Sequence, residues 1–351
     1  MTHTANPTVV IGEIAMSVPY ASTTSTLKRL SSYEDGYNLY EVTVNHDYNI
    51  DELIGESARN DQSFADSISR QFFPNLSIKM KAPFFGCSAF RAYANGVVLT
   101  GRNYDFKEDS SALLVRTHPK DGYAAIAFAC LNNLGENVPD KDDESKLVSV
   151  FAPFASLDGL NEKGVSISVL TLDSEPVNQQ TGKPAINTAL AIRMVLDRAS
   201  TTQEAIDILA SYDMHAAAGR DYHFFINDAI GTSVVVEYDL RDPGRRIIVT
   251  PAREITNYYA AYADEVKPNQ HNVNLGHGKE RALAIADVFN ANGKGMSREA
   301  AWDALRASSQ DPNPEDITSN TQWSVLYDNT NLTAEIVLRR HWGDAFSFTL
   351  E

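Results

Sequence analysis

The sequence predicts an α+β fold built from layers of sheet and helix. Short strand-like segments follow one another from Cys87 onward, helical patterns interrupt them in two places, and strands return before the end. Runs of strands separated by runs of helices are typical of this fold class. Two antiparallel sheets between helical layers would account for the number of segments. A chain of 351 residues, 43% of them hydrophobic, can bury a core of that size.

The first part of the chain carries fewer structural signals than the rest. Its first 35 residues are rich in turn formers, and residues 39–44 alternate like a strand. Residues 60–73 place apolar side chains at helical spacing, and Pro74 suits the end of that helix.

From Cys87 onward the apolar pattern predicts twelve strands and four helices. Pro184 suits the start of the first helix, Thr201 or Thr202 caps the second, and Ser297 caps the fourth. The strands are expected near 88–93, 97–101, 111–116, 123–130, 148–152, 165–170, 222–227, 232–238, 246–250, 322–328, 333–338 and 345–350, and the helices near 185–199, 202–212, 279–291 and 297–308.

Composition and charge exclude several classes of function. A net charge of −16 disfavours binding to nucleic acid or anionic membranes. No stretch reaches the roughly 18 apolar residues of a membrane span, and no signal-peptide pattern opens the chain, which predicts a cytoplasmic location. None of the eight histidines has ligand spacing with another His or Cys, and no phosphate-binding glycine loop exists, so we expect no metal and no cofactor. The sequence leaves open whether the chain forms a homo-oligomer.

Residues 87–105 predict a β-hairpin. Asn95 and Gly96 are a strong two-residue turn signal, because both tolerate positive φ. A turn centred on this pair places Cys87 opposite Tyr104. The hairpin therefore brings a thiol to the same end as the polar residues that close the second strand.

A thiol, a guanidinium and a carboxylate are expected to meet at this end of the hairpin. Arg102 would favour the thiolate of Cys87, because a neighbouring cation lowers a thiol pKa. Asp105 would orient the arginine, or hold the α-ammonium if Cys87 becomes a chain start. Strict alternation puts Arg102 and Asp105 on opposite faces, so we expect the strand to end before Asp105 or a bulge to intervene.

A plain hairpin is the alternative interpretation of the same residues. In that case Cys87 is a packing residue and Arg102 and Asp105 form a surface ion pair. The second cysteine, Cys130, lies in an apolar run and is interpreted as a buried core thiol.

The wider sequence pattern resembles the choloylglycine hydrolase family of linear amide C–N hydrolases. That family includes bile salt hydrolases and penicillin V acylases, and acid ceramidases and N-acylethanolamine acid amidases are relatives. The resemblance spans residues 87–351. It rests on Cys87-Ser-Ala-Phe, Gly101-Arg-Asn-Tyr-Asp105, Asp158-Gly-Leu-Asn-Glu-Lys-Gly-Val165, Thr256-Asn257 before an aromatic residue, Gly278-Lys-Glu-Arg281 and Thr321-Gln-Trp-Ser-Val325.

The resemblance implies the αββα sandwich of N-terminal-nucleophile (Ntn) hydrolases and a set of site residues. Cys87 would be the nucleophile and, through its own amine, the base, with Arg102 and Asp105 positioning and polarising it. Asn257 would donate its side-chain N–H to the oxyanion, a contribution of roughly 3–4 kcal/mol in comparable sites. Arg281 would support the charge network. As alternatives, Asn257 only caps a turn and Arg281 lies on a helix surface.

Two features depart from the bile salt branch of this family. Thr171 stands where bile salt hydrolases have a second oxyanion-related asparagine, and a hydroxyl does not mimic an amide. In addition, residues 1–86 precede the cysteine, which resembles the acid ceramidase and amidase branch. We therefore expect self-cleavage between Gly86 and Cys87, with 1–86 retained as a docked small subunit and 87–351 as the catalytic domain.

The predicted function is hydrolysis of a small-molecule N-acyl amide to a carboxylic acid and an amine. A bile salt hydrolase or penicillin V acylase proper is the alternative within the class. An uncleaved, non-catalytic relative is the alternative outside it.

Overall fold

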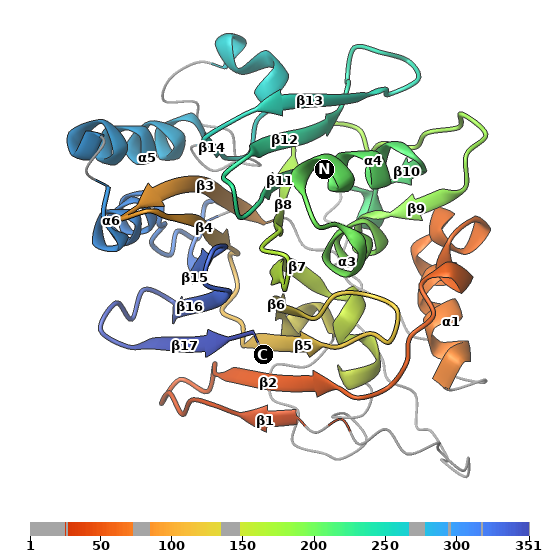
Figure 1. Ribbon diagram of the computed structural model, residues 1–351, viewed down its shortest axis with the longest axis horizontal. Helices are drawn as coiled ribbons and strands as arrows, with labels where there is room; N and C mark the ends of the chain where they lie inside the picture. Colours follow the sequence, from red (N-terminus) through yellow and green to blue (C-terminus); the bar gives the residue numbers. More distant parts are fainter. Residues whose placement is uncertain are drawn as a thin grey trace.

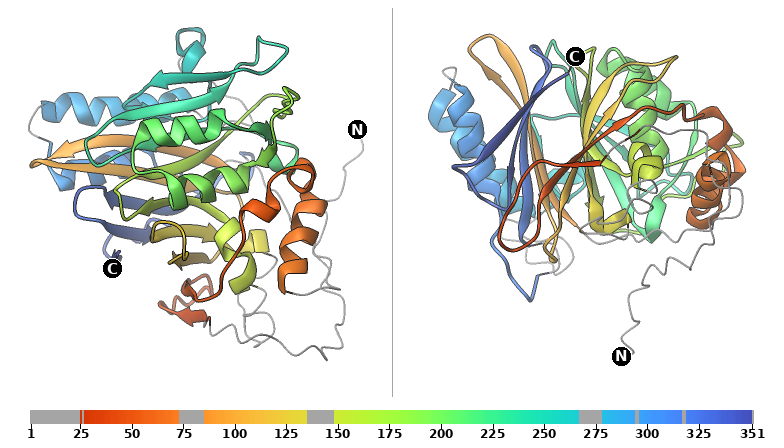
Figure 2. Two further views of the ribbon diagram at one scale, coloured as in Figure 1. Left: turned by 45° about the vertical axis from the view of Figure 1, so that its right-hand side comes forward. Right: turned by 90° about the horizontal axis from the view of Figure 1, so that it is seen from below.

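The computed structural model describes residues 25, 27–72, 85–134, 148–266, 278–293, 296–316 and 319–350. Two β-sheets lie face to face, and helices cover the outer face of each (Figures 1 and 2). The right-hand view of Figure 2 shows the four layers edge-on. The α+β class and the αββα sandwich expected from the sequence are confirmed.

The larger sheet has nine strands in the order β1-β2-β5-β6-β7-β8-β11-β12-β13. Neighbouring strands are antiparallel except β2 and β5, which are parallel. The strands are β1 (Leu27–Arg29), β2 (Leu39–Val44), β5 (Ala112–Thr117), β6 (Ala125–Cys130), β7 (Ser156–Asn161), β8 (Ser166–Leu172), β11 (Asp221–Asn227), β12 (Ser233–Tyr238) and β13 (Ile247–Pro251).

The smaller sheet has six antiparallel strands in the order β14-β3-β4-β15-β16-β17. Its strands are β14 (Glu254–Ile255), β3 (Gly86–Ala94), β4 (Val97–Asp105), β15 (Thr321–Asp328), β16 (Thr333–Leu338) and β17 (Ala345–Thr349). A separate parallel pair joins β9 (Ala185–Asn187) to β10 (Asp213–His215).

Helices form the two outer layers. On the larger sheet lie α3 (Thr188–Arg198) and α4 (Thr202–Ala210), with α1 (Asp61–Phe72) beside them, and on the smaller sheet lie α5 (Gly278–Asn292) and α6 (Arg298–Ser308) (Figure 2). Short 3-10 turns occur at Asp51–Leu53, Glu56–Arg59, Leu131–Leu134, Ala152–Phe154, Ala217–Gly219 and Ala260–Glu265. Within the described residues, no helix is both long and apolar enough to span a bilayer.

Two of the predicted helix caps are confirmed. The Thr201 hydroxyl accepts a hydrogen bond from the Glu204 backbone N–H, and Ser297 caps α6 in the same way. The helix expected from Pro184 begins later, because Asn187 provides its cap.

Several element predictions were wrong or incomplete. Residues 148–152, expected to form a strand, form a helical turn. Strand β7, which comes next along the chain, was not predicted. The short strands β1, β9, β10 and β14 were also missed. The predicted helix end at Pro74 lies outside the described residues, and α1 is described to Phe72.

The N-terminal segment is an integral part of the larger sheet. Strand β2 pairs with β5 along its whole length, from Leu39 opposite Ala112 to Val44 opposite Thr117. Strand β1 adds a further edge to the sheet beyond β2. Residues before Cys87 therefore do more than pack on the sandwich, because they extend one of its two sheets.

Candidate active site

The hairpin β3–β4 has the register that the sequence predicted. Asn95 and Gly96 adopt φ of 52° and 87°, as a two-residue turn requires. Cys87 lies opposite Tyr104, and the pairing runs without a break from Gly86 to the turn. Since the Cys87 side chain is 0% exposed, the thiol sits inside the sandwich and not on its surface.

Arg102 lies on the same face of the hairpin as Cys87 and is fully buried. Its Nε is 2.7 Å from Oδ2 of Asp158 on β7, and its Nη2 donates to the Val169 carbonyl at 3.1 Å. The Cys87 thiol donates to that same carbonyl at 3.6 Å. Asp158 therefore orients the arginine, and Val169 brings the arginine and the thiol together.

The expected role of Asp105 as the partner of Arg102 is wrong. Strand β4 continues through Asp105 and keeps its register with β3, so neither an early strand end nor a bulge in this hairpin occurs. The register irregularity lies instead on β15, between Thr321 and Trp323. Arg102 and Asp105 consequently lie on opposite faces, Arg102 between the sheets and Asp105 toward α5 and α6.

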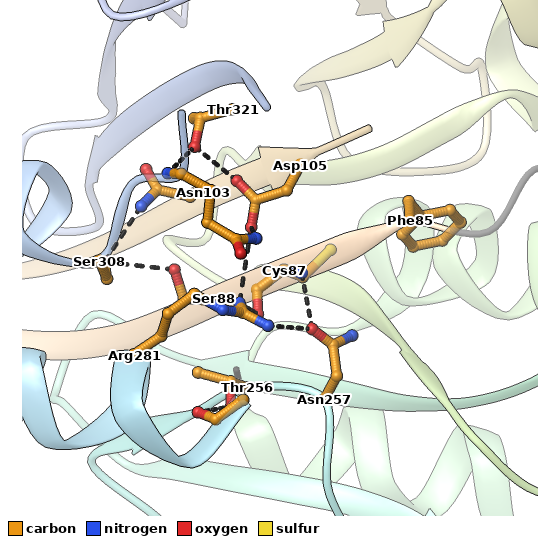
Figure 3. A network of polar contacts seen from close by, with 12 residues as sticks. Phe85, Cys87, Ser88, Asn103, Asp105, Thr256, Asn257, Arg281, Ser308 and Thr321 are labelled. Carbon is orange, nitrogen blue, oxygen red and sulfur yellow. Dashed lines mark hydrogen bonds and ion pairs between the residues drawn. The ribbon is translucent and has the colours of Figure 1, made fainter. Parts of the chain in front are cut away.

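Asp105 belongs to a second buried network on the helix-facing side of the hairpin (Figure 3). Its Oδ1 accepts from the Thr321 hydroxyl at 2.6 Å, and its Oδ2 accepts from the Gln310 amide at 3.0 Å. Nη1 of Arg281 lies 3.5 Å from Oδ2. Burial raises the pKa of the Asp105 carboxyl, while Arg281 and the two hydrogen bonds act in the opposite direction.

Asn257 contacts the backbone of Cys87 directly (Figure 3). Its Oδ1 accepts from the Cys87 N–H at 2.8 Å, and its Nδ2 donates to the Thr171 carbonyl at 2.8 Å. An amide nitrogen carries two hydrogens, so one donor is not used by this bond. The hydrogen-bond acceptor of the Cys87 nitrogen is thus an asparagine oxygen, whereas the sequence had suggested that Asp105 would hold this nitrogen.

Arg281 connects these groups from the first turn of α5. It is 5% exposed, which excludes the surface position considered as its alternative. Nη1 donates to the Cys87 carbonyl at 2.5 Å, and Nη2 donates to Oδ1 of Asn257 at 2.9 Å. One guanidinium therefore holds the Cys87 backbone, Asn257 and Asp105 in a single cluster.

The Cys87 thiol is neutral in this environment. Burial raises its pKa to about 12, even though Arg102 and Arg281 act to lower it. Arg102 acts on this pKa in the expected direction, but desolvation outweighs it. Cys130 is fully buried in β6, as a core thiol should be.

A largely apolar cavity of about 100 Å³ is lined by two neighbours of the cysteine. Phe85, the residue two positions before Cys87, forms part of its wall, and so does Val169, whose carbonyl accepts from the thiol. Helix α1 contributes Asp61 and Phe64 to the same cavity. The remaining lining includes Phe154, Leu157, Ile192 and Tyr222.

Sequence reasoning missed three residues of this site. Asp158 was quoted only as the start of a motif, because the strand that buries it, β7, was not predicted. Thr321 was likewise quoted only as the start of a motif and Gln310 not at all, because both reach Asp105 through tertiary structure. No cluster of three or more His, Cys, Asp or Glu side chains in the described part of the chain is arranged to hold a metal ion.

The αββα sandwich is the fold of the Ntn hydrolases, and a buried cysteine lies at the start of its central hairpin. Residues 87–242 match the sequence model of "Linear amide C-N hydrolases, choloylglycine hydrolase family". This is the family that the motifs resemble, and the match indicates a hydrolase that acts on C–N bonds of linear amides. The match begins at Cys87 and ends before Asn257 and Arg281.

Solved structures share the fold of this chain. A mutant of the conjugated bile acid hydrolase from Clostridium perfringens superimposes with a TM-score of 0.56 and 15% identity, over 75% of this chain and 92% of that one. Penicillin V acylase from Agrobacterium tumefaciens gives 0.55 and 19%, over 75% and 86%. No curated protein sequence matches the chain.

Proposed function

We propose that this chain is a cysteine Ntn hydrolase that cuts itself between Gly86 and Cys87 and then hydrolyses N-acyl linear amides. The observation that carries the proposal is the environment of Cys87. Its thiol, its nitrogen and its carbonyl each contact a different buried polar group, from Val169, Asn257 and Arg281. The family match that begins at this residue supports the same assignment.

Self-cleavage begins with an N-to-S acyl shift. Sγ of Cys87 bonds to the carbonyl carbon of Gly86, the C–N bond breaks, and the thiol proton passes to the Cys87 nitrogen. Water then hydrolyses the thioester, which releases the Gly86 carboxylic acid and regenerates the thiol. Glycine before the cysteine suits this step, since it accepts unusual backbone geometry at little steric cost.

The cut supplies the base that the uncut chain lacks. An α-amino group has a pKa near 7.7–8.0, so it can take the thiol proton near neutral pH. Asn257 already holds this nitrogen at 2.8 Å, and its unused amide hydrogen is available to an oxyanion. Attack on a substrate amide then releases the amine, and water resolves the thioester to a carboxylic acid.

We propose that residues 1–86 remain bound as a small subunit after the cut, with 87–351 as the catalytic domain. The pairing of β2 with β5 supports this, because it does not depend on the covalent link. Side-chain contacts add to it: Asp61 accepts from the Ala218 N–H at 2.7 Å, and Arg59 binds His215 at 2.8 Å.

Intact mass spectrometry tests the proposal, with the second buried cysteine as a matched control. The wild-type chain should yield fragments 1–86 and 87–351, Cys87→Ala should stay whole and inactive, and Cys130→Ala should still be cut. A wild-type chain that stays whole through long incubation at several pH values would favour a non-catalytic relative. Amidase activity in pure Cys87→Ala protein would reject the nucleophile.

A further inference from the structure

The residues just before the cut are bound by a polar group inside the site. The Thr171 hydroxyl donates to the Phe85 carbonyl at 2.8 Å, and the Thr171 carbonyl accepts from Asn257. Thr171 is 1% exposed, so this is a specific buried contact and not a surface bond. Thr171 therefore holds both the segment just before the proposed cut, at Phe85, and the asparagine that binds the Cys87 nitrogen.

The Phe85 side chain occupies an aromatic slot. It stacks on Tyr222 with 5.9 Å between ring centroids and 26° between planes, and it lies 5.4 Å from the tilted ring of Tyr104. Its exposure is only 3%. Beyond the ring lies the apolar cavity of about 100 Å³, so the slot leads into further open space.

Maturation and turnover produce the same kind of intermediate in this place. In the first, Sγ of Cys87 carries the acyl group that ends in Phe85-Gly86; in the second, it carries the acyl group of a substrate. Both acyl groups are bonded to the same sulfur atom, and water must reach both carbonyl carbons at this place. The slot that holds Phe85 in the uncut chain is therefore the space open to a substrate acyl group once the cut end has withdrawn from it, while the β2–β5 pairing keeps 1–86 on the larger sheet.

We propose that Phe85-Gly86 is the enzyme's first acyl substrate and that its chemistry marks the preferred class: amides of N-acylglycines whose acyl group ends in an aromatic ring. Thr171 binds the inner amide carbonyl, as it binds the Phe85 carbonyl now, and Tyr104 and Tyr222 hold the ring. This inference rests on the proposed function and names the substrate class of the same site.

The available volume agrees with one ring and a short chain. An apolar cavity of roughly 150 Å³ is enough to bind benzene. The space left by the Phe85 ring together with about 100 Å³ beyond it meets that requirement. A fused steroid acyl group is much larger and has no carbonyl at the position of the Phe85 carbonyl.

Substrates with one common leaving amine test the proposal on the wild-type, fully cut protein. The set contains the 7-amino-4-methylcoumarin amides of hydrocinnamoyl-glycine, of its all-carbon analogue 6-phenylhexanoic acid, and of cholic acid. We expect kcat/KM for the first to exceed the second by about tenfold, as loss of one buried hydrogen bond implies. Equal or faster hydrolysis of 6-phenylhexanoyl or choloyl amide would overturn the proposal.

Variants of the hydroxyl give an independent measurement. Thr171→Val should reduce the preference for the glycyl substrate over its all-carbon analogue to near one, and Thr171→Ser should restore it. Thr43→Val, on β2 of the same sheet, is the matched control and should keep the full preference. Rates are divided by the amount of fragment 87–351, so that slower cutting of a variant does not enter the comparison.

The outcomes separate this inference from the proposed function. If Thr171→Val is never cut, the wild-type substrate comparison alone decides. A cut protein that prefers the all-carbon amide rejects the substrate class and leaves the hydrolase intact. A chain that is not cut at all rejects the proposed function, and the substrate class with it.

Discussion

The buried ion pair between Arg102 and Asp158 gives a prediction whose magnitude follows from the structure. Both side chains are 0% exposed, and Nε and Oδ2 are 2.7 Å apart. Asp158 also accepts from the indole N–H of Trp323 and the hydroxyl of Tyr327. In Asp158→Asn, the one amide oxygen can still accept from Tyr327 at the Oδ1 position. The NH₂ group at the Oδ2 position then faces both the Nε–H of Arg102 and the indole N–H of Trp323.

We expect Asp158→Asn to lower the free energy of unfolding by about 3–5 kcal/mol, the usual effect of leaving one buried charge unpaired. The attraction lost is about 6 kcal/mol at an effective dielectric of 20, and partial relaxation reduces it. Urea unfolding, followed by tryptophan fluorescence in the uncut Cys87→Ala background, measures the change. That background removes any contribution from self-cleavage.

Two further variants test whether the unpaired charge of Arg102 causes this loss of stability. Glu41→Gln breaks the partly exposed pair with Arg116, also 2.7 Å long, and should cost less than about 1 kcal/mol. The double change Arg102→Met with Asp158→Leu removes both charges and should be more stable than Asp158→Asn alone. A loss below about 1 kcal/mol in Asp158→Asn, or a double variant less stable than the single one, would refute this reasoning.

Two other predictions concern the cysteine and its surroundings. Arg281→Lys keeps a charge but loses the fork that joins the Cys87 carbonyl to Asn257, so cutting should slow by about tenfold or more, as timed by fragment appearance. Lys279→Arg, on the same turn, should cut at the wild-type rate; equal rates for both variants would remove Arg281 from the site. Because burial raises the pKa of Cys87 to about 12, the thiol stays neutral as pH rises past its ordinary value. Iodoacetamide labelling of Cys87 in the uncut chain should therefore still rise at about pH 10, and a plateau near pH 9, typical of a free thiol, would contradict this.

The hairpin could be read from the sequence because its determinants are local. A two-residue turn at Asn95 and Gly96 fixes the register of both strands, and that register alone placed Cys87 opposite Tyr104. The caps at Thr201 and Ser297 depend on side chains within three residues, so they were also predictable.

The errors arise where the outcome depends on tertiary structure. The apolar run at 148–152 is too short to distinguish a buried helix from a strand, and the structure makes it helical. Strand β7 is buried on both faces, so it lacks the alternation that marks a half-exposed strand. The partner of Arg102 could not be found by local spacing, since Asp158 arrives from the opposing sheet.

In the proposed cut form, strand β2 would hold two polypeptides together. After a cut at Gly86–Cys87, the pairing of β2 with β5 joins two separate polypeptides, so the nine-stranded sheet becomes a heterodimer interface. Unfolding then releases two chains instead of one. The melting temperature of the cut form consequently depends on protein concentration, whereas that of the uncut form does not. Dilution, which leaves the uncut form unaffected, would then dissociate the cut form.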